Sequence, residues 1–411
     1  MNRESAVPRG QRAEFAAVAT LALGFGLVGI DRFLITTLFP VIARDLQLSY
    51  DDIGIITGAL AIAWGLSALF VGNLSDRLGR RRVLTVSLIV FSLLIGASGL
   101  AEGLLSLVAV RVLMGFADGA YTPASIAATL QVSAPRRRGL NIGIQQMMLP
   151  LFGLGIAPLM VAGALRFIEW RWIFLAFVLP GLALARALWR LIPPVATILE
   201  TTPTTAVAAW KSVLAVPNVR IAALLMLCWL TCLITTSAFM PNYLIDHLKL
   251  PVAQMGVVMS GIGLGATAGT VLLASLSDRL GHKPVLILSS AGALLALLLL
   301  INTGPQTQML FACLFMVHFF NNALITLTVG PLCTEAVPVS LMATASGLVI
   351  AIGELFGGGI APVVVGHLAQ RFGIDQILKL PIAMLAVGAL SCLVIRKPVV
   401  QSPYALGRGS A

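Results

Sequence analysis

The chain has 411 residues, of which 58% are apolar and only 10% are Asp, Glu, Lys or Arg. A soluble domain is about one quarter charged, because charged residues cover the surface that faces water. The composition therefore excludes an ordinary soluble enzyme and, with 39 glycines, indicates a polytopic membrane protein. The formal net charge of +11 would suggest nucleic acid in a soluble protein. In a membrane protein it reflects topology, and we expect no nucleic-acid partner.

Twelve apolar stretches are long enough to cross a bilayer, which takes about 20 helical residues each. In the first half they cover residues 14–40, 52–75, 82–101, 103–128, 140–165 and 170–192. In the second half they cover residues 219–245, 253–277, 284–303, 308–335, 341–367 and 376–396. We therefore predict an all-α membrane protein of 12 transmembrane helices, arranged as two pseudo-symmetric six-helix bundles.

The positions of Lys and Arg predict the orientation, because short cytoplasmic loops carry an excess of these residues. With the N-terminus placed in the cytoplasm, nineteen of the 27 basic residues fall on the cytoplasmic side and six on the other. We expect both termini in the cytoplasm and a multi-pass protein of the cell membrane, in a bacterium the inner membrane. The predicted parts are an N-terminal arm (1–13), a bundle (14–192), a linker (193–218), a second bundle (219–396) and a tail (397–411).

The two halves of the chain repeat each other. Residues 72–82 (GNLSDRLGRRR) return as residues 274–284 (ASLSDRLGHKP), and residues 151–158 (LFGLGIAP) return as residues 355–362 (LFGGGIAP). The offsets of 202 and 204 residues each span six helices, so the two halves share one topology. We expect them to be related by an axis along the membrane normal.

The motif between the second and third helices, echoed between the eighth and ninth, resembles that of the major facilitator superfamily. The resemblance covers residues 14–396. It implies a substrate site near the middle of the membrane, between halves that rock against each other. In that family the motif latches the cytoplasmic side when the outside is open. The residues that carry this role here are Gly72, Asp76, Arg77, Gly79 and Arg80, with Asp278, Arg279 and Gly281 as a weaker copy.

The charged residues deepest inside the predicted spans are Asp31, Arg32, Arg111, Asp118 and Glu354. Each costs about 2.5–3.5 kcal/mol on insertion scales, so each is a functional candidate. Asp31 in the first helix and Arg111 in the fourth lie at similar depth and can form an ion pair. Three acids against two arginines leave one acid unpaired, as a proton-binding site requires.

The pattern Asp31-Arg32, with an Arg-x-x-x-Gly-x-x-Asp run from Arg111 to Asp118, resembles the anion:cation symporter branch of the superfamily. WRWIF at residues 170–174 fits the same branch. The resemblance implies that Asp31 and Asp118 carry protons and that Arg32 and Arg111 link them to a substrate carboxylate. The branch more often has Glu where Asp118 stands. On this hypothesis an entering anion competes with Asp31 for an arginine, and the displaced acid takes up a proton.

Glu354, in the eleventh predicted helix, has no counterpart in the first half, where Pro150 stands. It is either a third proton site, a contact for an amine on the substrate, or a structural group bonded to backbone or Asn322. Other polar side chains near mid-membrane are candidates to bind the substrate or to pack: Trp64, Tyr121, Gln145, Gln146, Asn321 and Asn322.

The predicted function is proton-coupled uptake of a small organic anion, driven by the proton gradient with no cofactor. The alternative is a proton-driven antiporter that exports a drug or metabolite, including one that bears an amine. The sequence carries no nucleotide-binding, metal-hydrolase or esterase motif, and the five cysteines show no metal spacing. We therefore expect no enzyme activity and no metal. The expected partners are the small-molecule substrate, protons and the lipid bilayer, with the chain acting as a monomer.

Overall fold

The computed structural model describes residues 11–192, 206–338 and 341–395, apart from the side chains at 69–78, 135, 206–209 and 343. The regular elements in these residues are all helical, and twelve of the helical spans are long and apolar enough to cross a membrane. The prediction of an all-α protein with 12 transmembrane helices is confirmed, and each span lies within a few residues of its predicted range.

The N-terminal half holds six spans. The first four are α1 (Gln11–Leu46), α2 (Tyr50–Leu78), α3 (Arg80–Ser98) and α4 (Leu104–Val132). After the short turn η1 (Pro135–Arg137), the fifth is built from α5 (Arg138–Pro150), the π-helical segment η2 (Leu151–Ile156) and α6 (Ala157–Ala164). The sixth is built from α7 (Trp170–Ala176) and α8 (Val178–Leu191). A short helix, α9 (Ala206–Leu214), lies within the predicted linker.

The C-terminal half follows the same order. Its spans are α10 (Pro217–Asn242) with η3 (Tyr243–His247), α11 (Val252–Leu280), α12 (His282–Ile301), and α13 (Thr307–Leu327) with η4 (Thr328–Leu332). The eleventh span joins α14 (Met342–Ile352), the π-helical segment η6 (Gly353–Ile360) and α15 (Ala361–Phe372). The twelfth joins η7 (Ile374–Leu378) and α16 (Lys379–Leu393).

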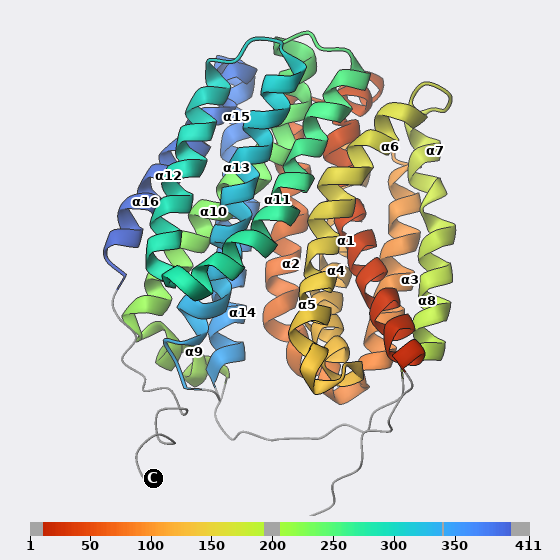
Figure 1. The fold of residues 1–411 in the computed structure, drawn as a ribbon. Helices are drawn as coiled ribbons and strands as arrows, with labels where there is room; N and C mark the ends of the chain where they lie inside the picture. The colour runs from red at the N-terminus through yellow and green to blue at the C-terminus, as the bar shows by residue number, and fades with distance from the viewer. Residues whose placement is uncertain (1–10, 193–205, 339–340, 396–411) are drawn as a thin grey trace, which may run out of the picture.

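The two halves stand side by side as separate bundles (Figure 1). Helix α1 begins and α16 ends at the end of the molecule drawn at the bottom of Figure 1, which we call the lower end. The opposite end, where α1 connects to α2, is called the upper end. Large apolar side chains within the spans, such as Leu113, Leu299 and Leu390, are exposed on the bundles. Since twelve spans carry such surfaces, the protein is a multi-pass membrane protein.

The duplicated sequence LFGxGIAP forms the π-helical segment in each half and places it against the other half. Segment η2 packs on α11, and η6 packs on α2. Glycines permit backbone contact along these seams: a Cβ atom on Gly58 of α2 would lie only 2.5 Å from the carbonyl oxygen of Gly359 in η6. Higher up α2, a Cβ atom on Gly54 would lie 2.5 Å from the carbonyl oxygen of Pro362. The halves therefore meet through main chain along these seams.

Polar side chains also join the halves at the upper end. Asp246 of η3 receives a hydrogen bond of 3.1 Å from the hydroxyl of Tyr50 and lies 3.5 Å from the guanidinium of Arg44. The side-chain amide of Asn242 donates to the same carboxylate at 2.9 Å. The backbone N–H of Tyr50 donates to Gln370 of α15 at 3.1 Å. We call Arg44, Tyr50, Asn242, Asp246 and Gln370 the upper cluster; it holds the halves together at this end.

Candidate functional site

Arg111 of α4 is the centre of a buried polar group inside the N-terminal half. Its guanidinium donates to the backbone carbonyl of Asp31 in α1 at 2.9 Å and to the hydroxyl of Ser98 in α3 at 2.9 Å. The nearest carboxylate oxygen of Asp31 lies 3.7 Å from the same guanidinium. The ion pair expected from the depths of Asp31 and Arg111 is therefore present. Both side chains are almost fully buried.

Asp118 lies nearly two helical turns along α4 from Arg111 and is fully buried. Its carboxyl interacts with that of Asp31 and with the charges of Arg32 and Arg111. Among the described residues, neither oxygen of Asp118 has a hydrogen-bond partner. An unpaired carboxylate buried in this way is costly. Asp118 therefore fits the acid without a cation that the charge count predicted, and its role as a proton carrier stays a prediction.

Arg32 points away from this group and joins the two halves. Its two terminal nitrogens donate to the two carboxylate oxygens of Glu354 at 3.0 and 2.7 Å, a bidentate ion pair. The guanidinium carbon lies 4.6 Å from the centre of the Trp64 ring in α2, close enough for a cation–π contact. The side chains of Arg32 and Glu354 are only 9% and 7% exposed. Among the described residues, the carboxylate of Glu354 bonds to Arg32 and not to backbone or Asn322, as the structural alternative required.

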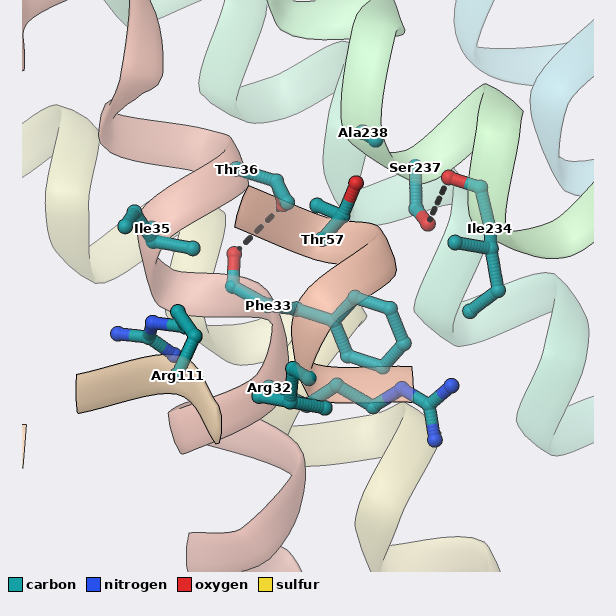
Figure 2. Close-up of a pocket in the computed structure, with 10 residues that line it drawn as sticks. Arg32, Phe33, Ile35, Thr36, Thr57, Arg111, Ile234, Ser237 and Ala238 are labelled. Atoms are coloured by element: carbon teal, nitrogen blue, oxygen red, sulfur yellow. Dashed lines mark hydrogen bonds between the residues drawn. The ribbon is translucent and has the colours of Figure 1, made fainter. Parts of the chain in front are cut away.

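A small cavity lies between the halves beside both arginines (Figure 2). It is lined from α1, α2 and α4 on one side and from α10 on the other. Its volume of about 20 Å³ holds little more than a water molecule, so a larger ligand requires the halves to move apart. Arg32 and Arg111 point in different directions from it in Figure 2, with apolar side chains such as Phe33 between them.

Three hydroxyl groups on the cavity wall were not singled out from the sequence. The hydroxyl of Thr36 donates to the carbonyl of Phe33 at 2.8 Å, and that of Ser237 donates to a carbonyl of its own helix α10. The hydroxyl of Thr57 donates to the carbonyl of Ile53 at 2.7 Å. Each proton is bonded to a carbonyl of its own helix, and the surface that the cavity exposes is almost entirely apolar. Their only signal in the sequence is a Ser or Thr within an apolar helix, and such residues also occur where they have no function.

The other predicted substrate residues do not line this cavity. Tyr121 is buried against Phe91 and donates a 3.5 Å hydrogen bond to the carbonyl of Leu21. Polar contacts within one half hold most of the others. Gln145 donates to Ser125 at 2.9 Å, Asn321 to the carbonyl of Trp229 at 3.1 Å, and Asn322 to Thr270 at 3.0 Å, while Gln146 is half-buried. Their part in binding a substrate stays a prediction.

The predicted gate motif lies at the lower end of α2. Gly79 and Gly281 have φ angles of +85° and +88° at the turns that follow α2 and α11, which favours glycine there. Asp278 and Arg279 are exposed. Gly72 lies within α2, the side chains of Asp76 and Arg77 lie outside the described part of the chain, and Arg80 has an interaction of its own. The role of these residues as a latch stays a prediction.

Metal-binding side chains do not gather anywhere in the described residues: no three His, Cys, Asp or Glu lie close enough to hold an ion. The five cysteines are buried and free. Two six-helix bundles that meet around a buried, charge-lined cavity form the architecture of a secondary transporter.

The chain belongs to the Major Facilitator Superfamily, whose sequence profile matches residues 21–362 and 233–410. It is 25% identical over 363 residues to the "Probable 4-methylmuconolactone transporter" of Cupriavidus pinatubonensis, covering 85% of this chain and 83% of that protein. It is 27% identical over 340 residues to the 3-(3-hydroxy-phenyl)propionate transporter of Escherichia coli, covering 80% of each. These relatives are transporters, so the chain is placed with transporters and not with enzymes.

The fold agrees with this assignment. A bacterial homologue of the human lysosomal transporter Spinster, solved in an inward-facing and unoccupied conformation, superposes with a TM-score of 0.81. The match covers 96% of this chain and all of that one, at 18% sequence identity. At this identity the likeness concerns the fold alone.

Proposed function

We propose that the protein imports a small organic carboxylate together with protons, by alternating exposure of the site between the two halves. The observation that carries the proposal is the buried charge set of two arginines and three acids: Arg32 and Glu354 join the halves, and Asp31, Arg111 and Asp118 lie inside the N-terminal half. Arg32 offers a carboxylate a planar pair of donors beside the cavity. The relative named for a propionate supports the same substrate class.

We assign the proton site to Asp31 and Asp118. Arg111 lies between these two acids and the rest of the site. Their carboxyls interact, and one positive charge cannot balance both in a water-free interior. One proton shared by Asp31 and Asp118 leaves the two acids with a single negative charge, which Arg111 neutralises. When that proton is released on one side of the membrane, an uncompensated negative charge remains and disfavours closure of the site. Glu354 belongs to the same set, because a substrate bound to Arg32 leaves Glu354 without its cation.

The substrate displaces Glu354 rather than Asp31. The sequence hypothesis had the anion compete with Asp31 for an arginine. Arg111 holds Asp31 through its backbone and is nearly fully buried, whereas Arg32 is bound by an ion pair that spans the halves. Exchanging one bidentate carboxylate for another costs little in hydrogen bonding and frees the halves to move.

For the orientation we propose that the lower end faces the cytoplasm and the upper end faces outside, following the basic residues of the loops. The upper cluster then closes the outer side in this structure. Gly72, Asp76, Arg77, Gly79 and Arg80 close the inner side in the opposite state. Export of a cationic compound is less well supported, since Arg32 already neutralises Glu354.

The test is uptake into proteoliposomes of the purified protein with an inward proton gradient, using a panel of radiolabelled carboxylates. Asp118→Asn should reduce accumulation against a gradient at least about tenfold, because the variant cannot take up and release a proton at this position. Exchange of substrate at equal concentrations on the two sides should survive. Asp375→Asn, at an exposed acid far from the site, is the matched control. Accumulation by Asp118→Asn at the level of the control would refute coupling through Asp118.

A further inference from the structure

A line of buried polar side chains continues from Asp118 along α4 toward the lower end. Ser125 and Thr129 lie about two and three turns further along α4, on the same face as Asp118, and both are fully buried. Ser133, at the end of α4, is also buried. These side chains lie inside the N-terminal half and do not line the cavity between the halves.

Helix α5 supplies the other side of this line (Figure 1). The side-chain amide of Gln145 donates to the hydroxyl of Ser125 at 2.9 Å. One turn lower on α5, the amide of Asn141 donates to the hydroxyl of Ser133 at 2.8 Å. Thr129 lies between these two bonds along α4. We call Ser125, Thr129, Ser133, Asn141 and Gln145 the polar seam.

Two oxygen atoms of the polar seam lack a hydrogen-bond partner among the described residues, namely the hydroxyl of Thr129 and the amide oxygen of Gln145. Buried threonines elsewhere, such as Thr85 of α3, donate to a carbonyl of their own helix. Both carboxyl oxygens of Asp118 are likewise unpartnered. Buried polar atoms of this kind are commonly bonded to ordered water. The polar seam is therefore suited to hold water below Asp118.

Glu14 closes the polar seam at the lower end. It lies in the first turn of α1, and its side chain is only 9% exposed. Its carboxylate accepts hydrogen bonds from the side chain of Asn141 at 3.2 Å, from the backbone N–H of Ala134 at 3.1 Å and from Arg137 at 2.7 Å. Arg137 is 41% exposed, so this ion pair lies where the seam reaches water.

Charge distinguishes two routes for a proton between Asp118 and water. Asp31, Arg32 and Arg111 are the charged groups that act on Asp118. A route through the cavity between the halves passes both arginines, which line it and repel a moving positive charge. From Asp118 to the end of α4 the sequence has no Lys or Arg, and the basic residues at 136–138 are exposed or paired with Glu14. The polar seam is the route that charge favours.

We infer that Asp118 exchanges its proton with water at the lower end through the interior of the N-terminal half, along the polar seam and past Glu14. The inference rests on the proposed proton coupling and separates the path of the proton from that of the substrate. The proton leaves a carboxyl oxygen of Asp118 and passes along water and the hydroxyls of Ser125, Thr129 and Ser133, one O–H bond breaking as the next forms. The negative charge of Glu14 attracts it to the lower end.

The experiment follows the proton on Asp118 by rapid infrared spectroscopy, with heavy water as the probe and no substrate. The C=O stretching band of a protonated carboxyl shifts when deuterium replaces the proton, and the band that Asp118→Asn lacks belongs to Asp118. Purified protein in lipid nanodiscs, with both ends in contact with solvent, is transferred to heavy water and the rate of the shift is measured.

Thr129→Val keeps the shape of the side chain and removes the hydroxyl. We expect it to slow the shift about tenfold, because the moving proton is one hydrogen-bonding group short. Glu14→Gln should slow the shift several-fold, because the attracting charge is lost. Thr85→Val, which removes a buried hydroxyl of α3, is the matched control and should leave the rate unchanged.

Thr57→Val removes a hydroxyl from the wall of the cavity between the halves and tests the other route. Slower exchange in Thr57→Val with an unchanged rate in Thr129→Val places the proton in the cavity and overturns the inference. Equal rates in the native protein, Thr129→Val and Glu14→Gln overturn it as well, and both results leave proton coupling through Asp118 standing. Absence of an Asp118 band from the native protein at every pH overturns the proposed proton site, and the inference with it.

Discussion

At the scale of the residue, Arg111 and Arg32 perform different tasks although both are arginines in the membrane interior. Arg111 is held by Asp31 and Ser98 and is almost fully buried. Arg32 is held by one ion pair and one aromatic ring at the junction of the halves. The first arrangement is suited to a fixed countercharge, and the second to a ligand that is exchanged.

Removing the countercharge should destabilise the protein. Arg111→Met leaves Asp31 and Asp118 buried without a cation, and breaking a buried pair in this way costs about 3–5 kcal/mol. The five buried cysteines provide the measurement, because a thiol-reactive dye reports their exposure as the protein unfolds on heating.

Arg166→Met, at an exposed residue, is the matched control and should leave the unfolding temperature nearly unchanged. Adding Asp118→Asn to Arg111→Met leaves a single carboxyl in place of the interacting pair and should recover part of the loss. A double variant no more stable than Arg111→Met would argue that Asp118 is not charged beside Arg111.

The residue scale also marks the limit of sequence reasoning about the site. The spacing of Arg111 and Asp118 and the depth of Asp31 could be predicted, because helical geometry converts sequence distance into position. The partner of Glu354 could not be predicted: Arg32 lies 322 positions away in the other half, and only the packing of the halves brings them together. The position of Tyr121, which faces its own bundle, could not be predicted either, because hydrophobic periodicity does not say which neighbouring helix a helix face contacts.

At the scale of the element, twelve spans and their approximate ends follow from hydropathy because a bilayer excludes backbone polar groups that are not bonded internally. The π-helical geometry of η2 and η6 does not follow from hydropathy. In η2 and η6 it coincides with packing of the duplicated glycine-rich motif against α11 and α2 of the opposite half, and η3 and η4 are π-helical without that motif. The sequence repeat predicted that the two segments are equivalent, and in the structure each of them packs against the opposite half.

The glycine seam yields a prediction about movement. Gly58→Ala places a methyl group about 2.5 Å from the carbonyl oxygen of Gly359, so α2 and η6 must separate. We expect uptake to slow by about tenfold and the protein to lose about 1–3 kcal/mol of stability from the overpacking. Gly143→Ala in α5, where an added Cβ meets no atom within 4 Å, should be neutral or slightly stabilising. Equal effects of the two changes would show that the seam tolerates an added side chain.

At the scale of the whole molecule, the conformation is set by the balance of contacts at the two ends. The upper cluster joins the halves through Asp246, which contacts Tyr50 and Arg44 of the other half. The Arg44 contact is solvent-exposed and contributes little, whereas the Tyr50 hydrogen bond reaches a partly buried carboxylate. Losing about 2 kcal/mol here shifts the ratio of the two states by roughly 30-fold.

Asp246→Ala should therefore open the upper end. The measurement is the rate at which a membrane-impermeant maleimide labels a cysteine introduced at Thr57, which lines the cavity on α2. In vesicles labelled from outside, we expect Asp246→Ala to speed labelling several-fold, because the site is exposed there more often. Asp375→Ala, an exposed acid of the same end outside the upper cluster, is the control. Faster labelling only from the inside would reverse the proposed orientation, and an unchanged rate from both sides would mean that the main-chain seams alone hold the upper end closed.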